Sequence, residues 1–308
     1  MTPRKVPSMR RPLALIVAAI TLATVAACTN ASQSLDKTTS SALPKISVDA
    51  KAAALLPAQV KSAGKIVFAS DASYAPFEYF ATDNQTMIGF DIQLTDAVAE
   101  VLGVKAQHVN AGFDTILPGL QAGKYDAGVS AFSITQDRAK VVDFVPYLAI
   151  GTGLAVAKGN PQKLSLDDPT SLCGKAISAQ KGSIQGITIL PAFAAKCQAA
   201  GKSTIRIQMY PSQNEANLAL TSGRADGILA DSVPLAYQGQ QAGGSFELAP
   251  GKDYQAVPIG IAIPKGSALG PALSAAVRVL AADGTLAKLM EQWKVPAGDL
   301  VRSTELVR

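Results

Sequence analysis

Two segments of the sequence place charge-binding groups where a predicted strand ends. In the first, Ala127–Arg138 (AGVSAFSITQDR), small apolar residues are followed by hydroxyls and the guanidinium of Arg138. In the second, SGRADGILADS, an apolar run ends at Asp231. Arginine presents a planar fork that binds a carboxylate through two parallel hydrogen bonds, and an aspartate accepts hydrogen bonds from an ammonium. The pair would therefore fit the carboxylate and the ammonium of a free amino acid.

A third segment could bind the same anion. Gly182 and Ser183 precede a predicted helix, and the backbone N–H groups at a helix N-terminus favour negative charge. These groups supplement the fork of Arg138 in the amino-acid hypothesis.

Each of these residues also has an alternative role. Arg138 could be a solvated helix charge paired with Asp137 or Asp143, and Asp231 could cap the helix SVPLAYQGQ. The aromatic residues nearby could belong to the core; these are Tyr74, Phe77 and Phe113. The binding hypothesis depends on the conjunction of the residues and not on any one of them.

The elements that would position these groups alternate between strands and helices. Residues 64–71 contain the β-branched pair Ile66 and Val67 and predict a strand, and residues 91–103 carry one apolar face and end at glycine, which predicts a helix. Residues 82–90 predict a hairpin turn between strands. Such alternation predicts a mostly parallel sheet flanked by helices.

Two phrases of the sequence repeat one design. LQAGKYDAGVSAFS and LTSGRADGILADSV both run from a helix through glycine, a basic residue and Asp into a strand with a polar end. Two α/β units of the same design predict two lobes. Because ligands of open α/β sheets sit beyond the carboxyl ends of the strands, the two polar ends are expected to face each other across a cleft.

The length and charge limit the classes of protein that fit. The 308 residues suffice for two ordinary cores. The net charge of +5 arises mostly from four basic residues before Pro12, and without residues 1–27 the chain has 24 basic and 23 acidic residues. No later segment combines a basic cluster with stacking aromatics, so a nucleic-acid partner is not expected.

The N-terminus predicts export. A basic start is followed by the apolar run 13–27, which is too short for a membrane-spanning helix and typical of a signal peptide, residues 1–27. Val25-Ala26-Ala27-Cys28 resembles a bacterial lipobox, which implies acylation of Cys28; the alternative is a plain secretory signal. Residues 28–45 predict a flexible tether, and the rest of the chain is expected on the extracytoplasmic face of the cell membrane.

The other cysteines and the histidine do not predict catalysis. Cys173 and Cys197 form an even pair in an oxidising compartment, which predicts a disulfide and not a metal site. His108 is the single histidine of the chain and lies in a predicted strand, where a structural role is expected. No nucleophile motif is present, and neither a cofactor nor a metal is expected.

Several motifs in order identify a resemblance. They are DASYAPFEYF, GFDIQL, FDTILPGLQAGKYDAG, SITQDR with VDFVPY, QKGSIQG, SGRADGILADS and DGTLAKLMEQWKV. Over roughly Gly64 to Val295 the chain resembles the extracellular solute-binding proteins of bacterial ABC importers, in the polar amino-acid family. The resemblance implies a binding protein and not an enzyme, with the permease and ATPase subunits of an importer as partners.

The same resemblance implies a periplasmic-binding-protein fold that closes on its ligand. Lobe 1 would comprise residues 46–150 and 257–308, and lobe 2 the inserted residues 151–256. Two crossover strands, near Gly151–Leu154 and Ala256–Gly260, would form the hinge. A monomer is expected.

The resemblance also implies roles for individual residues. Arg138 would bind the α-carboxylate, helped by the Ser133 hydroxyl and the Ile184 backbone N–H. The α-ammonium would bind Asp231 and the Ser130 carbonyl. The ligand side chain would lie between Tyr74 and Phe113, and its far end would meet Asp71, Glu78, Gln185 and Ser183.

The chain departs from the family pattern beside the side-chain pocket, and this leaves the ligand open. Ala131, Phe132 and Ile184 replace residues that are common in relatives. Asp71 and Glu78 suggest a cationic side chain, although relatives that bind glutamine or glutamate also carry an acid there. Two other functions remain open: a cyclohexadienyl or arogenate dehydratase on the same fold, with Glu78 as general acid, and an amino-acid sensing subunit.

Overall fold

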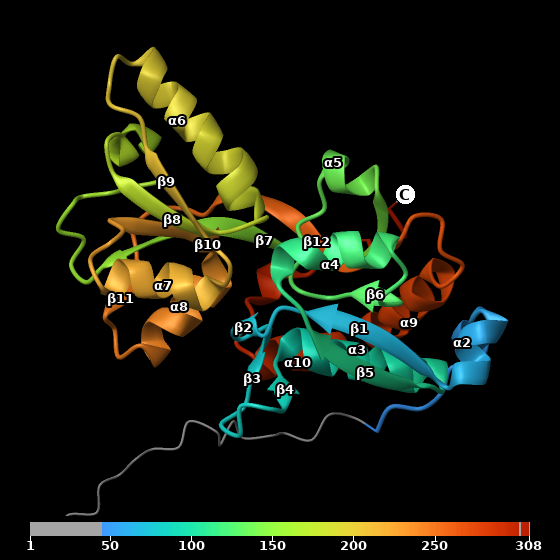
Figure 1. The fold of residues 1–308 in the computed structure, drawn as a ribbon. Helices are drawn as coiled ribbons and strands as arrows, with labels where there is room; N and C mark the ends of the chain where they lie inside the picture. The colour runs from blue at the N-terminus through green and yellow to red at the C-terminus, as the bar shows by residue number, and fades with distance from the viewer. Residues whose placement is uncertain (1–44, 302, 308) are drawn as a thin grey trace, which may run out of the picture. The chain divides into compact units, whose positions relative to one another are not determined.

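A computed structural model of the protein describes residues 45–301 and 303–307, and the element labels follow Figure 1. The predicted signal peptide, Cys28 and the tether up to residue 44 lie outside the described residues.

Two long antiparallel strands connect the two lobes. They are β7 (Val142–Ala157) and β12 (Tyr254–Pro264), and they pair from Val142 opposite Pro264 to Thr152 opposite Tyr254. Among the described residues the sheet has the order β5-β1-β6-β12-β7-β10-β8-β9, with β11 beside β7. Each long strand therefore contributes one end to each lobe.

Lobe 1 combines parallel strands with helices on both sides of the sheet. β5 and β6 both pair with β1 in parallel, while α4 lies on one side and α3, α9 and α10 lie on the other (Figure 1). A small antiparallel sheet, β2-β3-β4, precedes α3. The strands are β1 (Lys65–Ser70), β2 (Ser73–Tyr74), β3 (Glu78–Phe80), β4 (Met87–Ile88), β5 (Lys105–Asn110) and β6 (Ala127–Gly128). The helices are α1 (Ala50–Ala54), α2 (Ala58–Ala63), α3 (Phe90–Leu102), α4 (Phe113–Gln121), α5 (Gln136–Ala139), α9 (Gly270–Ala282), α10 (Thr285–Gln292) and the short η3 (Ala297–Asp299).

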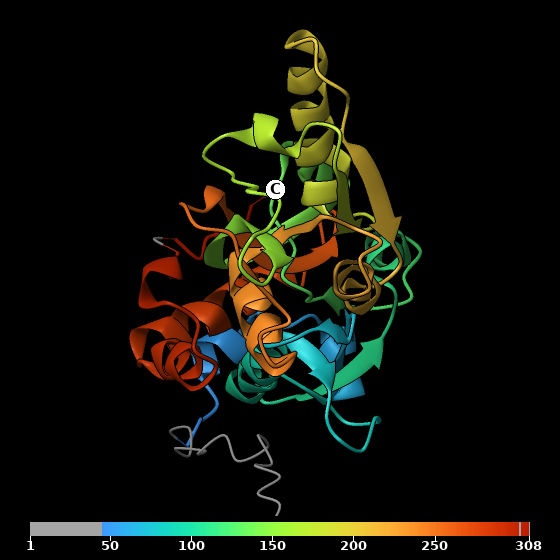
Figure 2. The same cartoon turned by 90° about the vertical axis from the view of Figure 1, so that its left-hand side faces the viewer.

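Lobe 2 repeats the arrangement on a smaller scale. β10 and β9 both pair with β8 in parallel, and β10 also pairs with β7, so that Asp231 lies opposite Thr152. Helix α6 lies on one side of this sheet and α7 and α8 lie on the other (Figures 1 and 2). The strands are β8 (Ala176–Gln180), β9 (Arg206–Tyr210), β10 (Gly227–Asp231) and β11 (Phe246–Leu248). The helical segments are η1 (Pro169–Leu172), η2 (Gln185–Ile189), α6 (Leu190–Ala199), α7 (Gln213–Thr221) and α8 (Ser232–Gln241).

The predicted disulfide is confirmed in lobe 2. Cys173, which follows η1, is bonded to Cys197 on α6, with their Cα atoms 5.5 Å apart. Cys197 is fully buried in the core beneath α6, together with Phe193 and Leu190. The bridge therefore fastens α6 to the start of the lobe.

Local sequence explains where the main helices begin and end. The predicted apolar face of α3 is buried, and the helix ends at Gly103 with a φ of 73°, a left-handed conformation that glycine adopts without strain. Helix α7 begins with a capping box, in which Ser212 and Glu215 each accept a hydrogen bond from the other's backbone N–H.

One predicted helix differs from the structure. We expected a continuous helix after Gly182, but residues Gln185–Ile189 form a π-helical turn and α6 begins only at Leu190. Pro191 has no N–H to donate to the preceding turn, which explains why regular α-helical bonding starts late.

Neighbouring atoms lie so close to two glycines of the crossover strands that no side chain would fit there. A Cβ atom at Gly151 would lie 2.5 Å from the Cβ of Asp253, and one at Gly260 would lie 2.9 Å from the carbonyl oxygen of Val145. Side chains are therefore excluded from both positions in this arrangement. The lobe boundaries and hinge rotation remain predictions.

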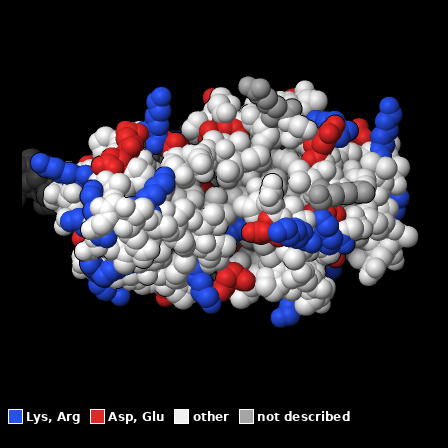
Figure 3. All heavy atoms as spheres, turned by 90° about the horizontal axis from the view of Figure 1, so that it is seen from above, with Lys and Arg blue, Asp and Glu red and all other residues white. Residues whose placement is uncertain are grey.

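The charges on the surface are mixed on the face seen in Figure 3. Acidic and basic side chains are interspersed there, and most of the area is uncharged.

Candidate functional site

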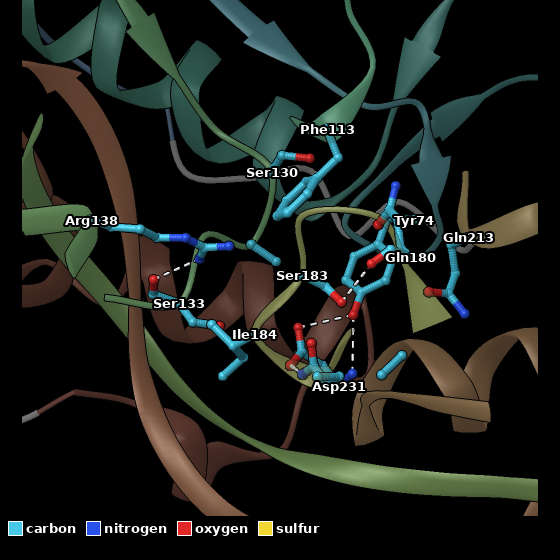
Figure 4. A pocket seen from close by; sticks show the side chains of 13 residues that line it. Tyr74, Phe113, Ser130, Ser133, Arg138, Gln180, Ser183, Ile184, Gln213 and Asp231 are labelled. Carbon is cyan, nitrogen blue, oxygen red and sulfur yellow. Dashed lines mark hydrogen bonds between the residues drawn. The ribbon is translucent and has the colours of Figure 1, made fainter. Parts of the chain in front are cut away.

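A cavity lies between the lobes, and its wall is built from both of them (Figure 4). The strand ends of β6, β8 and β10 all reach it, as expected for ligand sites beyond the carboxyl ends of strands. The lining residues from lobe 1 are Tyr74, Phe113, Ser130, Ala131, Ser133 and Arg138; those from lobe 2 are Gln180, Ser183, Ile184, Gln185, Gln213, Ala230 and Asp231.

Arg138 is a buried cation in this wall. It lies on α5, which is capped by Thr135, whose hydroxyl accepts a hydrogen bond from the Arg138 backbone N–H. The guanidinium donates to the carbonyl oxygens of Ser133, at 2.7 Å, and Gly182, at 2.9 Å. Burial lowers the pKa of Arg138 to about 10, so the group stays charged at neutral pH.

The alternative role for Arg138 is wrong. Its side chain is not solvated, since the residue is only 9% exposed. The nearby carboxylates are paired elsewhere, Asp137 with Lys140 and Asp143 with Lys265. The Arg138 guanidinium lies 5.6 Å from the centre of the Phe113 ring, and Phe113 also lines the cavity.

Asp231 provides the anion of the opposite lobe. It ends β10, is 4% exposed and accepts hydrogen bonds from the Tyr74 hydroxyl, at 2.9 Å, and the Gln185 amide, at 2.8 Å. Burial raises the pKa of Asp231 to about 6, and these bonds together with the charge of Arg138 oppose that rise. Although Asp231 stands at the N-cap position of α8, its side chain makes no capping bond, so the capping alternative is wrong.

Tyr74 connects the two lobes directly. Its hydroxyl donates to Asp231 Oδ2 and accepts from the Asp231 backbone N–H at 3.0 Å, and Figure 4 shows the ring reaching across the cavity. Other bonds across the cavity join Asp71 to Gln180, Ser73 to Gln213 and Arg138 to Gly182, and an ion pair joins Lys181 to Asp114. The lobes are therefore in a closed arrangement.

Asp71 lies just behind the cavity wall. Its Oδ2 atom accepts from the Phe113 backbone N–H, at 2.8 Å, and from the Gln180 amide, at 3.1 Å. Both donors belong to residues that line the cavity, so the carboxylate is one hydrogen bond away. Burial is the largest effect on Asp71 and raises its pKa above the ordinary value.

The structure brings nine of the ten predicted ligand-binding residues to one cavity. They are Tyr74, Phe113, Ser130, Ser133, Arg138, Ser183, Ile184, Gln185 and Asp231, and Asp71 lies behind them. Among residues that were expected to border the pocket, Ala131 and Ile184 line it, while Phe132 stacks behind Phe113 with ring centres 4.8 Å apart. Glu78 is fully buried and is not part of the wall.

Sequence reasoning missed Gln180, Gln213 and Ala230. Gln180 ends β8 and Ala230 precedes Asp231 in β10, so the rule for strand ends applies to both. Gln213 reaches the cavity because its backbone N–H donates to the Ser73 hydroxyl, a contact across 140 residues that no local pattern indicates.

Within the structure's described ranges, no group of three or more His, Cys, Asp and Glu side chains is arranged to hold a metal. His108 pairs with Asp96 at 2.8 Å and does not line the cavity.

Comparisons with known proteins decide the family. The family of bacterial extracellular solute-binding proteins, family 3, matches residues 66–296. This chain belongs to that family. Within it, an arginine-binding protein of Corynebacterium glutamicum is 32% identical over 245 residues, covering 80% of this chain and 79% of the relative. An ABC transporter arginine-binding protein of Escherichia coli is 30% identical over 236 residues, covering 75% and 91%.

A solved structure agrees with the fold and the family. An ancestral arginine-binding protein bound to arginine has a TM-score of 0.66 and 31% identity, and the match covers 75% of this chain and 98% of that one. The predicted two-lobed fold and the solute-binding role are confirmed, and so is the expectation of a binding protein rather than an enzyme. In the part of the chain that the structure describes, no helix has the length and hydropathy needed to cross a membrane.

Proposed function

We propose that this chain captures a free amino acid with a cationic side chain, of the arginine class, between its lobes and delivers it to the permease of an ABC importer. The relatives reported above, named for arginine, support the ligand class, and the E. coli relative supports the transporter partner.

One observation carries this proposal: Arg138 from lobe 1 and Asp231 from lobe 2 are both buried and line the same cavity. Two buried opposite charges that do not bond to each other suit a zwitterion placed between them. The α-carboxylate binds Arg138, with help from Ser133 and Ile184. The α-ammonium binds Asp231 and the Ser130 carbonyl.

The side chain of the ligand runs toward Asp71. Tyr74 and Phe113 offer aromatic faces on which a planar guanidinium stacks favourably. Asp71 supplies a carboxylate one hydrogen bond behind the cavity wall. The Gln180 amide donates to this carboxylate in the structure, and on binding the ligand's cation takes the place of that amide. The far end also meets Ser183 and Gln185.

Binding works by population shift between open and closed arrangements. A ligand that contacts both lobes binds the closed form more tightly than the open form, and this difference in affinity shifts the equilibrium toward the closed form. Hydrogen bonds to charged groups contribute roughly 1.5–3 kcal/mol each, so several of them suffice for micromolar binding. Lobe 1, residues 46–150 and 257–308, then rotates against lobe 2, residues 151–256, about β7 and β12.

A thermal-shift screen of the purified full-length chain against the twenty amino acids and ornithine tests the proposal. A ligand that binds only the native state raises the melting temperature, and arginine is expected to give the largest shift. The Arg138→Ala variant serves as the matched control and is expected to show a much smaller shift at the same ligand concentration. If no amino acid raises the melting temperature, the proposed function is wrong.

We also propose that the chain is held at the extracytoplasmic face of the membrane through acylated Cys28, as a monomer. The lipobox-like sequence before Cys28 supports the anchor. Cys28→Ser is expected to release the protein from membranes into the soluble fraction. A variant that stays membrane-bound would show that another anchor exists.

A further inference from the structure

Two buried carboxyls lie directly behind the cavity wall and have no role in the function proposed above. Glu78 is the first residue of β3, and Asp91 lies in the first turn of α3. Both are fully buried. None of the ion pairs among the described residues involves either of them. Two buried carboxyls without a cation need another source of stabilisation.

Both carboxyls accept hydrogen bonds from the segment that follows β6, at Ser130 and Ala131. The Ser130 hydroxyl donates to Glu78 Oε1 at 2.5 Å, and the Ala131 backbone N–H donates to Asp91 Oδ2 at 2.9 Å. The Tyr147 hydroxyl donates to the same Asp91 oxygen, also at 2.9 Å. Ser130 and Ala131 both line the cavity, so each carboxyl is one hydrogen bond from the ligand site.

This segment needs such support because its backbone is strained. Ala131 has a φ of 42°, a left-handed conformation that residues with a side chain adopt at a cost. The bond from its N–H to Asp91 stabilises that conformation. The conformation in turn orients Ser130, whose carbonyl belongs to the proposed ammonium site.

The two carboxyls also contact each other. Glu78 and Asp91 act on each other's pKa, and Glu78 Oε2 and Asp91 Oδ1 are buried with no hydrogen-bond partner among the described residues. A bond between two carboxyls requires one proton. Burial, and next the charge of Asp91, raise the pKa of Glu78 well above its ordinary value, while burial raises the pKa of Asp91 to about 6.

We propose that Glu78 and Asp91 act as a positioning pair that shares one proton and carries one negative charge, and that this charge and its hydrogen bonds hold Ser130 and Ala131 in the conformation that receives the ligand's ammonium. The inference rests on the proposed amino-acid binding. The neighbouring titratable groups are Asp71, Tyr74, Tyr147 and Asp231, all acids, so no described cation neutralises the pair.

Amide substitutions in the purified full-length chain separate the proton from the charge. In Glu78→Gln the amide replaces the protonated carboxyl and donates to ionised Asp91. In Asp91→Asn the amide donates to Glu78, which then becomes the ionised partner. Each single variant therefore keeps one charge and one shared bond, whereas the double variant has neither. A matched control is Glu78→Gln with Asp126→Asn, which also removes two carboxyls but keeps Asp91.

Calorimetric titration with arginine measures the effect. Both single variants and the control are expected to bind arginine within about threefold of the original affinity. The double variant is expected to bind arginine at least about tenfold more weakly. For the arginine analogue without the α-amino group, the affinity of the double variant is expected to fall by no more than about threefold. A merely structural role would weaken both ligands equally.

Infrared spectroscopy at about pH 8 keeps the inference testable even if the double variant does not fold. The unchanged protein is expected to show the band of a protonated carboxyl, and each single variant is expected to lose it, because an amide now supplies the donor. Absence of the band in the unchanged protein, or arginine affinity in the folded double variant equal to the original, would overturn the inference. Failure of the unchanged protein to bind any amino acid would instead overturn the proposed function.

Discussion

The two repeated units build the same strand connection but end differently. In lobe 1, Asp126 accepts from the Val67 backbone N–H at 2.8 Å and returns its own N–H to the Val67 carbonyl at 3.0 Å. In lobe 2, Asp226 makes the same pair of bonds with Ala176, at 2.8 and 2.7 Å. The repeated Asp therefore fastens the start of one parallel strand to its neighbour in each lobe.

The difference lies at the other end of each strand. In lobe 1 the segment after β6 presents Ser130, Ala131 and, five residues after Ser133, the cation Arg138. In lobe 2 β10 ends on the anion Asp231. The Asp that the two units share fastens the sheet, and the residues that differ between them line the cavity.

The two lobes also differ in covalent support. Lobe 2 has the Cys173–Cys197 bridge, whereas no described residue of lobe 1 is a cysteine. This difference suggests that lobe 2, the smaller insertion, needs the additional stabilisation.

Replacing the cation of lobe 1 gives the largest expected effect. In the proposed binding mode Arg138→Ala removes two charge-assisted hydrogen bonds to the ligand at roughly 1.5–3 kcal/mol each, so amino-acid affinity is expected to fall at least about a hundredfold. Calorimetric titration measures the loss, with Arg206→Ala, at an exposed site of lobe 2, as the control. Unchanged affinity with cooperative unfolding would remove Arg138 from the site.

Removing the Cys173–Cys197 disulfide tests whether lobe 2 depends on this covalent stabilisation. The bridge spans 24 residues of sequence, and a loop of that length is stabilised by about 3 kcal/mol in the chain-entropy argument. Replacing both Cys173 and Cys197 by Ala is expected to lower the free energy of unfolding by about that amount, measured by denaturant titration. If stability does not change, lobe 2 does not depend on the bridge.

Changing the anion of lobe 2 should give a smaller loss that depends on pH. Asp231→Asn keeps the side-chain shape but removes the charge, and about a tenfold loss of affinity is expected at pH 7.5. Because the pKa of Asp231 is about 6 and an ammonium binds only its ionised form, affinity of the original protein should fall as pH drops below 6. The variant should show a shallower dependence, carried by Asp91, whose pKa is also about 6. Identical pH profiles would contradict this role of Asp231.

The shared residues should give the smallest effects, and the same effect in each lobe. Asp126→Ala and Asp226→Ala each remove one hydrogen bond from a partly buried carboxylate, so each is expected to cost about 1 kcal/mol of stability. Amino-acid affinity should not change in either variant. A large loss of affinity in only one of them would break the proposed equivalence of the two units.

Much of this arrangement could be predicted from the sequence, because local patterns determine it. The apolar face of α3 and the glycine after it predict that helix, and the strand-end rule leads to Arg138 and Asp231. Contacts between distant segments could not be predicted in the same way. The bond between Tyr74 and Asp231 joins residues 157 positions apart, and no periodicity indicates it. The late start of α6 and the position of Asp71 behind the wall depend on packing between the lobes.

The central claim is that Arg138 and Asp231 bind opposite ends of one amino acid. Calorimetric titration of the original protein, Arg138→Ala and Asp231→Asn with arginine and its analogues lacking the α-carboxylate or the α-amino group tests it most directly. Arg138→Ala is expected to weaken arginine and the analogue without the amino group, but not the analogue without the carboxylate; Asp231→Asn should show the reverse. Equal losses for all three ligands in both variants would contradict the account.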